Sequence, residues 1–556
     1  MFPRNLIIFL LILCYVKAGK ILVYSPSYSA SHIISNGRIA ETLAEAGHEV
    51  VVLIPEFMSS LSNFTGGIKK SKILRIPGVE KCLQKTKWMR FLTEKSSFII
   101  RKIYKSVKRF VRGKGYEDFG FEGGLMDSEF ATVSTRAAWE VEAAKVCDLI
   151  LQQKEILNHL KGEKFDAAFT EQIEFCGIGL IHYLEINKLL WLSTTPLMDA
   201  NSYNLAIPQP PSYVPVIEES DHGDRMNFWE RLDNQINYFK SIGIHLYGTN
   251  QMTKIFRDRI SPEFPCVREL ASRASIVFVN TDPIFDLPRP ISLKIQYIGG
   301  LGIHEAKPLD ENLSTLMSKG KRGIVFFSLG SVALFDTIPI NIRKAIIHDF
   351  SQMTEYHFII KIDNNDETTV DLLKGVTNID TVRWIPQADL LGHSRLKLFV
   401  THGGINGMIE AIYRSVPLVI VPIFADQFRN GRNAEMRGIG KAISKLKLAE
   451  VGKVVREVLQ DERYTNSMRS LSKRVKSHPM RAKETLLKWT EYVLSFGPLD
   501  DLSLEGKEMN AIIYFNLDVI FLLSIPPILF IFSIFLFIRT IFQSIFYRLK
   551  QKMKID

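Results

Sequence analysis

Two segments that lie far apart in the sequence begin with the same alternation of apolar strand, small-residue loop and helix. In the first, residues 20–24 are an apolar strand, the loop SPSYSASH follows, residues 33–46 have a helical pattern closed by Gly47, and residues 49–54 are a second strand. Strands connected through a helix pair in parallel, because the crossover helix returns the chain to the end of the sheet at which the first strand began. The segment therefore predicts a β-α-β unit of an open parallel sheet.

The second half of the chain opens in the same way. Residues 323–331, GIVFFSLGS, are an apolar strand followed by a turn of small residues. Helical patterns then separate further strands, which are predicted at residues 358–362, 381–384, 397–401 and 417–422. The sequence therefore predicts an α/β protein with two open parallel sheets, each covered by helices on both faces. The length of 556 residues also favours at least two domains, and we place them at residues 20–290 and 291–500.

Both ends of the chain are apolar and indicate a membrane protein. Residues 1–19 contain Arg4, an apolar run and small residues at the end, which is the anatomy of a signal peptide. Residues 519–538 are an apolar run of about 20 residues, the length that a bilayer core requires, and we predict a transmembrane helix over residues 517–538. The tail that follows, residues 539–556, is basic, so it is predicted to be cytosolic and the two domains luminal.

The chain ends in KMKID, in which Lys552 and Lys554 stand fifth and third from the carboxyl end. This dilysine pattern predicts retrieval to the endoplasmic reticulum, and the alternative is a plain basic flank of the membrane helix. A luminal location would make Asn63 and Asn312 glycosylation sites, because both stand in Asn-x-Ser/Thr patterns.

Cysteine and metal-ligating residues are sparse. Once Cys14 leaves with the signal peptide, four cysteines remain, at positions 82, 147, 176 and 266, which are too few for a disulfide scaffold. One bridge is possible and none is required. No cysteine–histidine cluster has zinc-ligand spacing, and no Asp-x-Asp pair is present to hold a divalent metal on a diphosphate. We therefore expect no metal.

The net charge of +11 is concentrated in residues 69–114, which contain sixteen lysines or arginines. Within this segment Ile99, Ile103, Val107 and Phe110 fall on one helical stripe. The pattern predicts either a helix on the membrane surface or a helix that covers the N-terminal core with a solvated basic face. A nucleic-acid ligand is not expected in a lumen, and the segment has no base-stacking motif.

Residues 399–411, FVTHGGINGMIEA, connect the end of an apolar strand to the start of a helix through two glycines. Glycine removes a side chain where the backbone must approach a ligand closely, and a helix start offers unpaired N–H groups and a positive dipole end to an anion. Gly330 and Ser331 repeat the arrangement after a neighbouring strand. Because ligands of open parallel sheets bind at the carboxyl ends of strands, we predict a diphosphate site here, with His402 as a further donor.

Other residues that follow predicted strands have side chains suited to the remainder of a nucleotide sugar. Trp384 offers a flat face to a base, and Glu410 can accept hydrogen bonds from both hydroxyls of a ribose. Asp426 and Gln427 follow the next strand and can bind sugar hydroxyls. Each residue alone is weak evidence, since a Gly-Gly turn is usually only a turn and a tryptophan at a strand end is usually core. The prediction depends on their joint spacing.

Residues 384–427, WIPQADLLGHSRLKLFVTHGGINGMIEAIYRSVPLVIVPIFADQ, resemble the signature of the membrane-bound UDP-glycosyltransferases of animals. The FSLGS and FNLDV segments and the basic tail are similar too, so the resemblance covers nearly the whole chain. It implies the GT-B glycosyltransferase fold, in which two Rossmann-like domains, an N-terminal acceptor domain and a C-terminal donor domain, face each other across a cleft. It also implies that a helix within residues 484–500 packs back before the membrane anchor.

The resemblance implies that ten residues of the C-terminal domain bind the donor. These are Ser331, Trp384, Gln387, His402, Gly404, Asn406, Gly407, Glu410, Asp426 and Gln427. Their roles in the family agree with the chemistry given above, and Gln387 is in addition implied to hold the base or the ribose. One position departs from the family, which commonly has serine where this chain has Gly407, so that only a backbone N–H is offered to a phosphate there.

The N-terminal half is expected to supply the catalytic base. His32 matches the catalytic histidine of the family, although a capping or buried histidine would be the better interpretation of this stretch alone. The family usually places an aspartate partner after the strand of residues 166–170, where this chain has Glu171. Glu174 is an alternative partner, whereas Asp166 stands at the wrong end of the strand.

The resemblance implies a single inverting displacement, in which His32 activates a hydroxyl of a small lipophilic acceptor for attack on UDP-glucose or UDP-glucuronate. The alternative is a catalytically silent protein of the same fold that binds UDP-sugars or lipophiles. The oligomeric state is open, and a homo-oligomer is possible.

Overall fold

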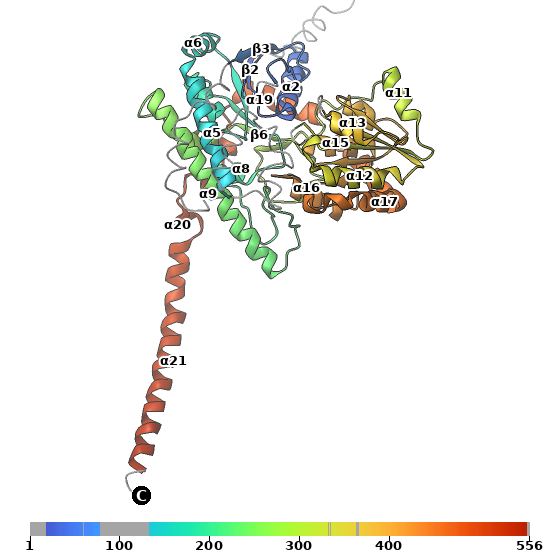
Figure 1. Cartoon of the computed structure of the whole chain (residues 1–556). Helices are drawn as coiled ribbons and strands as arrows, with labels where there is room; N and C mark the ends of the chain where they lie inside the picture. The colour runs from blue at the N-terminus through green and yellow to red at the C-terminus, as the bar shows by residue number, and fades with distance from the viewer. Residues whose placement is uncertain are drawn as a thin grey trace, which may run out of the picture. The chain divides into compact units, whose positions relative to one another are not determined.

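The computed structural model describes residues 18–58, 61–77, 133–331, 333, 335–362 and 366–552. The chain divides into two compact units, one ending at Ser503 and one beginning at Leu504. Two parallel sheets with helices on their faces make up the first unit (Figure 1). Most of the predicted signal peptide, the apolar stripe of residues 99–110 and Lys554 lie outside the described residues.

The first sheet has seven strands in the order β3-β2-β1-β4-β5-β6-β7, and every neighbouring pair is parallel. The strands are β1 (Lys20–Tyr24), β2 (Glu49–Pro55), β3 (Lys72–Ile76), β4 (Ala167–Glu171), β5 (Leu189–Ser193), β6 (Ile276–Val279) and β7 (Ile295–Tyr297). Helix α2 (Ala30–Glu45) connects β1 to β2 and completes the predicted β-α-β unit. The sheet extends past the boundary predicted at residue 290, because residues 295–297 pair with β6.

Helices cover both faces of this sheet, so its strands are apolar on both sides. On β4, for example, Ala168 belongs to the core on one face and Phe169 to the core on the other. The helices after β3 are α5 (Val133–Gln152), α6 (Lys154–Gly162), α7 (Cys176–Tyr183), α8 (Asp199–Asn204), α9 (Phe228–Arg259) and α10 (Val267–Ser272). A disulfide between Cys147 and Cys176 links α5 to the first residue of α7. Helices α5 and α9 run side by side (Figure 1).

The second sheet has six parallel strands in the order β10-β9-β8-β11-β12-β13. They are β8 (Gly323–Ser328), β9 (Tyr356–Lys361), β10 (Ile379–Val382), β11 (Leu396–Thr401), β12 (Leu418–Ile420) and β13 (Gly440–Ala442). The helices are α11 (Glu311–Ser318), α12 (Ile340–Ser351), α13 (Glu367–Leu372), α14 (Gln387–Leu391), α15 (Ile405–Arg414), α16 (Gln427–Met436), α17 (Val451–Gln460) and α18 (Glu462–Lys476). Because β10 ends at Val382, Trp384 lies in the loop beyond it and not in the strand that we predicted.

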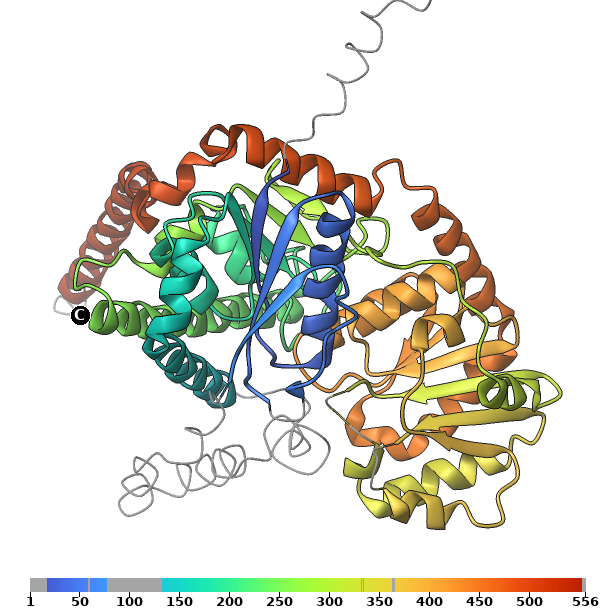
Figure 2. The same cartoon turned by 90° about the horizontal axis from the view of Figure 1, so that it is seen from above.

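The last helix of the first unit, α19 (Ala482–Phe496), returns from the second sheet to the first (Figure 2). Its apolar face contributes Leu486 and Val493, both fully buried, to the core that α2 also covers. The two sheets are thus connected twice, once after β7 and once through α19.

The second unit contains α20 (Ala511–Tyr514) and the long helix α21 (Leu517–Lys552). Among the described residues, α21 is the one helix with the length and apolar composition to cross a membrane, over Leu517–Tyr547. The apolar segment is longer than the predicted residues 517–538, and Pro526 and Pro527 lie inside an uninterrupted helix, as membrane helices tolerate.

Candidate active site

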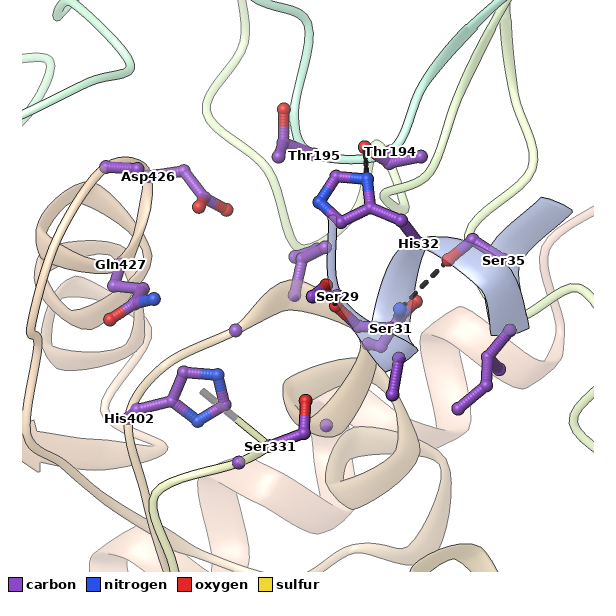
Figure 3. Close-up of a pocket in the computed structure, with 18 of the residues that line it drawn as sticks. Ser29, Ser31, His32, Ser35, Thr194, Thr195, Ser331, His402, Asp426 and Gln427 are labelled. Carbon is purple, nitrogen blue, oxygen red and sulfur yellow. Dashed lines mark hydrogen bonds between the residues drawn. The ribbon is translucent and has the colours of Figure 1, made fainter. Parts of the chain in front are cut away.

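A cavity of about 740 Å³ lies between the two sheets. The first sheet lines it with residues of α2 and of the loops after β4 and β5, and the second sheet with the turns after β8, β10, β11 and β12. These are carboxyl ends of strands, where open parallel sheets bind ligands. Figure 3 shows His32 and Thr194 facing the wall that carries His402, Asp426 and Gln427. Of the predicted catalytic and donor residues, all line this cavity except Glu171, which lies behind His32.

His32 and Glu171 form a hydrogen-bonded pair between α2 and the end of β4. The His32 Nδ1 atom lies 2.6 Å from Glu171 Oε2, and Thr194 Oγ1 lies 3.5 Å from the same nitrogen. Glu171 is 1% exposed, whereas His32 faces the cavity. A carboxylate accepts from Nδ1–H, which leaves Nε2 as the nitrogen with a free lone pair.

The electrostatics around His32 favour its protonated form. Burial lowers the pKa of His32, but the Glu171 carboxylate and Asp426 raise it, and the net result is a pKa above the usual value. The imidazole can therefore hold a proton that it receives in the cavity.

Glu174, the alternative partner, is used elsewhere. Its Oε2 accepts a hydrogen bond from the backbone N–H of Cys176 at the start of α7. Burial raises its pKa to about 8, so the carboxyl group is mostly neutral at neutral pH. Of the two acids, Glu171 is therefore the one that contacts His32, and its role as the catalytic partner stays a prediction.

His402 follows β11, and in space its ring lies between Gly330 and Gly404. A Cβ atom on Gly330 would come within 2.7 Å of the His402 ring, and a Cβ on Gly404 within 2.5 Å. These two glycines therefore make room for the imidazole, and their role in letting the backbone approach a ligand stays a prediction. Gly403 has φ +88°, a left-handed conformation that favours glycine. Burial, with a smaller contribution from Lys361, lowers the pKa of His402 to about 4, so the ring is neutral.

Glu410 on α15 and Gln387, the first residue of α14, contact each other. Gln387 Nε2 donates to Glu410 Oε2 at 2.9 Å, and the other carboxylate oxygen accepts from Arg38 of α2 at 2.8 Å. Asn406, one turn earlier on α15, also contacts the first domain. Its amide donates to Ser35 Oγ at 3.0 Å. Residues that we predicted only as donor ligands thus also join the two domains.

Trp384 and Ser331 are the predicted donor residues that are open to the cavity. Trp384 is 66% exposed, and the ammonium group of Lys361 lies 5.7 Å from its ring centroid. Phe64 of the first domain approaches the same ring edge-on, at a centroid distance of 6.3 Å. Ser331 is exposed in the turn after β8. An exposed tryptophan between apolar and cationic groups presents a face on which a planar base can stack.

Asp426 and Gln427 begin α16 on the opposite wall of the cavity (Figure 3). Burial raises the pKa of Asp426 to about 6, although a hydrogen bond from Asn430 opposes the shift. The side-chain oxygen Oε1 of Gln427 accepts from the backbone N–H of Ile423 at 2.9 Å, which fixes this side chain against the preceding loop. Both side chains are thus held in place by their own domain.

Gly407 lies on α15 beside Gln387. A Cβ atom there would lie 3.3 Å from Gln387 Nε2, so a serine at this position would press on the amide that holds Glu410. The departure from the family serine is thus compatible with the close packing of Gln387.

Sequence reasoning missed the residues that join the domains. Arg38 and Ser35 stand three residues apart on α2, and Ser35 stands three residues after His32, so the three share one helix face. That polar stripe was the available signal. Asn280, which donates to Asn406 Oδ1 at 2.8 Å, and Glu219, which accepts from the backbone N–H of Ala425, gave no signal in the sequence.

Comparisons with known proteins agree with this geometry. The family model described as "UDP-glucoronosyl and UDP-glucosyl transferase" matches residues 19–554. A putative UDP-glucuronosyltransferase of Caenorhabditis elegans, ugt-50, is 33% identical over 92% of this chain and 93% of its own. Human UDP-glucuronosyltransferase 2B15 is 29% identical over 94% of each chain. The solved structure of a UDP-glucosyltransferase from Polygonum tinctorium matches with a TM-score of 0.54 at 15% identity, over 86% of this chain and 99% of that one. The predicted two-domain GT-B fold is confirmed.

The contact between Arg38 and Glu410 generates a stability prediction. Replacing Arg38 with methionine should lower the free energy of unfolding by about 1–3 kcal/mol, because Glu410, whose side chain is 8% exposed, would stay buried without its charged partner. Arg75→Met is a matched control, since Arg75 has the same 22% exposure and pairs with Glu56 inside the first domain.

Denaturant unfolding of the detergent-solubilised chain measures both variants. Adding Glu410→Gln to Arg38→Met should recover part of the loss, because it removes the unpaired charge. Equal losses in the two arginine variants would contradict the assignment of a special role to the interdomain pair.

Proposed function

Because the chain belongs to the UDP-glucuronosyl and UDP-glucosyl transferase family, and is therefore a UDP-glycosyltransferase, we propose that it transfers glucose or glucuronate to a hydroxyl group of a small lipophilic acceptor. The observation that carries the proposal is the His32–Glu171 pair, which faces the predicted donor residues inside one cavity. A base on one domain and a sugar held by the other is the arrangement that direct transfer requires.

In the proposed reaction His32 Nε2 removes the proton from the acceptor hydroxyl. The oxygen forms a bond to the anomeric carbon, and the bond from this carbon to the diphosphate oxygen breaks, so that UDP leaves with the electron pair. Glu171 accepts from His32 Nδ1–H, keeps the imidazole in the required tautomer and stabilises the imidazolium that forms. A single displacement of this kind inverts the anomeric configuration.

The donor is proposed to bind across the second domain. Uracil stacks on Trp384, and the ribose hydroxyls donate to Glu410, whose carboxylate has more lone pairs than its two protein partners use. The diphosphate lies at the start of α15, near Ser331 and neutral His402. His402 lines the cavity, which supports a role for this ring in binding a ligand.

The sugar is proposed to contact Asp426 and Gln427, which line the cavity beside His32. The negative charge that develops on UDP is met by the backbone N–H groups and the dipole of α15, so the proposal assigns the chain's own residues to this charge and calls on no metal. Lys361, which also lines the cavity, adds a positive charge nearby.

A lipophilic acceptor is supported by the walls of the cavity on the side of the first domain. Its apolar residues include Trp139, Ile173, Phe175, Met198 and Ile244. Such walls remove apolar surface of a small molecule from water, which is the main source of affinity for ligands of this type.

We further propose that the two domains lie in the lumen of the endoplasmic reticulum, with α21 as the membrane anchor and the basic tail in the cytosol. The Cys147–Cys176 disulfide supports an oxidising compartment. Asn63 and Asn312 are both exposed, as glycan acceptors must be. Lys552 and Lys554 remain the proposed retrieval signal.

A transfer assay tests the proposed function. The full chain in detergent is incubated with radiolabelled UDP-glucose or UDP-glucuronate and a panel of phenols and sterols, and labelled product should form from at least one donor. His32→Ala should lower kcat by about 10²- to 10⁴-fold, the usual contribution of a general base. Absence of transfer from every donor would favour the alternative of a catalytically silent binding protein.

The partner of His32 gives a second prediction. Glu171→Gln should lower kcat by about 10²- to 10⁴-fold with little change in the KM for the donor. Because Glu171 raises the pKa of His32, and the base must be unprotonated, the acidic limb of the pH profile should move to lower pH in this variant.

Glu171→Asp should be the milder change. Glu174→Gln is the matched control, since Glu174 is equally buried but does not contact His32, and it should leave the acidic limb in place. A Glu171→Gln enzyme with a normal kcat and an unshifted limb would rule out the pairing as the catalytic one.

A further inference from the structure

The acceptor side of the cavity is not uniformly apolar. Helices α5 and α9, which lie side by side (Figure 1), each turn one face with i, i+3, i+4 spacing to the cavity. The residues are Arg136, Trp139 and Glu140 on α5, and Ser241, Ile244 and His245 on α9. Three of the six are ionisable, so this end of the cavity has electrostatic as well as apolar preferences.

The charges at this end do not cancel. Arg136 donates from one guanidinium nitrogen to both carboxylate oxygens of Glu218, at 2.6 Å each, so these two form a neutral pair. Burial, with a smaller contribution from Arg268, lowers the pKa of His245 to about 3. This ring is therefore uncharged, and its Nε2 contacts Asn204 Oδ1 at 3.1 Å. Of the three ionisable residues that α5 and α9 turn to the cavity, Glu140 is therefore the one whose charge is not offset by a described partner.

The position of the Glu140 carboxylate is fixed by a glycine on α9. A Cβ atom on Gly248 would come within 2.1 Å of Glu140 Oε2, so the carboxylate lies directly on the backbone of the neighbouring helix. Gly248 is inside α9, where glycine is less favourable than alanine. Among the described residues, no group donates a hydrogen bond to this carboxylate, although it is half-buried and lines the cavity.

We propose that Glu140 selects acceptors that carry an ammonium or other hydrogen-bond-donating group at the end remote from the hydroxyl that is glycosylated. The inference rests on the proposed function, because it treats this part of the cavity as the acceptor site. A partly desolvated carboxylate without a protein donor gains most from a charged donor, since charge-assisted hydrogen bonds are about twice as strong as neutral ones. The same carboxylate repels an acceptor that carries a carboxylate.

The acceptor preference should depend on pH. Burial raises the pKa of Glu140 to about 7, an effect that Arg136 reduces and Glu218 increases. An ammonium group favours the ionised carboxylate, so the preference for amines should grow as the pH rises from about 6 to about 8. Of the groups that face Glu140 from other elements, His245 is neutral throughout this range, and Glu218, whose pKa burial also raises, is paired with Arg136.

Three matched series of para-substituted phenols test the proposal. The substituents are alkyl chains of increasing length that end in an ammonium group, a methyl group or a carboxylate. For the wild-type chain, kcat/KM should be about tenfold or more higher for the ammonium than for the methyl compound at the best chain length, and lowest for the carboxylate. The readout is the ratio of kcat/KM for the ammonium compound to kcat/KM for the methyl compound. The titration of His32 affects both values equally and therefore cancels in the ratio.

Glu140→Gln should reduce the ammonium-to-methyl ratio to about one and remove its dependence on pH. Glu140→Asp keeps the negative charge but has a side chain that is one methylene shorter. The preference for the ammonium compound should therefore be greatest at a longer alkyl chain than in the wild type. Glu142→Gln is the control, since Glu142 is on the same helix, pairs with Lys145 at 2.7 Å and does not line the cavity. It should keep the wild-type ratio.

The outcomes separate this inference from the proposed function. If the wild-type chain glycosylates methyl-terminated phenols but shows an ammonium-to-methyl ratio near one, the role of Glu140 is overturned and the transferase function stands. The role is equally overturned if the preference for ammonium persists in Glu140→Gln. Absence of transfer to all three series would contradict the proposed function itself.

Discussion

The contact between α2 and α15 is the interaction on which the rest of the site depends. Each helix follows a strand of a different sheet, and each carries residues of the candidate active site near its start. Arg38 reaches Glu410, and Asn406 reaches Ser35, so the two helices are joined by one ion pair and one neutral hydrogen bond. Because the two sheets meet with their carboxyl ends, the proposed base and the proposed donor site share one cavity without any long insertion.

Burial sets different protonation states for residues that share this cavity. Burial lowers the pKa of His32, but Glu171 and Asp426 together raise it above its usual value, whereas burial and Lys361 both lower the pKa of His402, to about 4. One histidine can therefore receive a proton near neutral pH, while the other remains a neutral ring. The two imidazoles suit a proton acceptor on one domain and an uncharged donor of a hydrogen bond on the other.

Much of this arrangement could be predicted from the sequence because it is local. The strands and the crossover helices follow from hydrophobic periodicity. The roles of His32 and Glu171, which stand 139 positions apart, were instead implied by the family resemblance, and the rule that chemistry lies at the carboxyl ends of parallel strands favoured Glu171 over Asp166. The close packing of Gly330 and Gly404 against the His402 ring could not be predicted, because it depends on a side-chain position that no local pattern records. Contacts between the domains were also missed, since no local pattern records which residue of α2 meets which residue of α15.

The stereochemistry of the product is the most direct test of the central claim, which is that one base and one donor site act in a single displacement across the cavity. UDP-glucose and UDP-glucuronate carry the sugar in the α configuration, and the wild-type chain should convert either one to a β-glycoside of a phenol, as proton NMR of the isolated product can determine. An α-glycoside would require a second displacement, with a covalent or otherwise shielded intermediate. That result would contradict the account in which His32, paired with Glu171, activates the acceptor for direct attack.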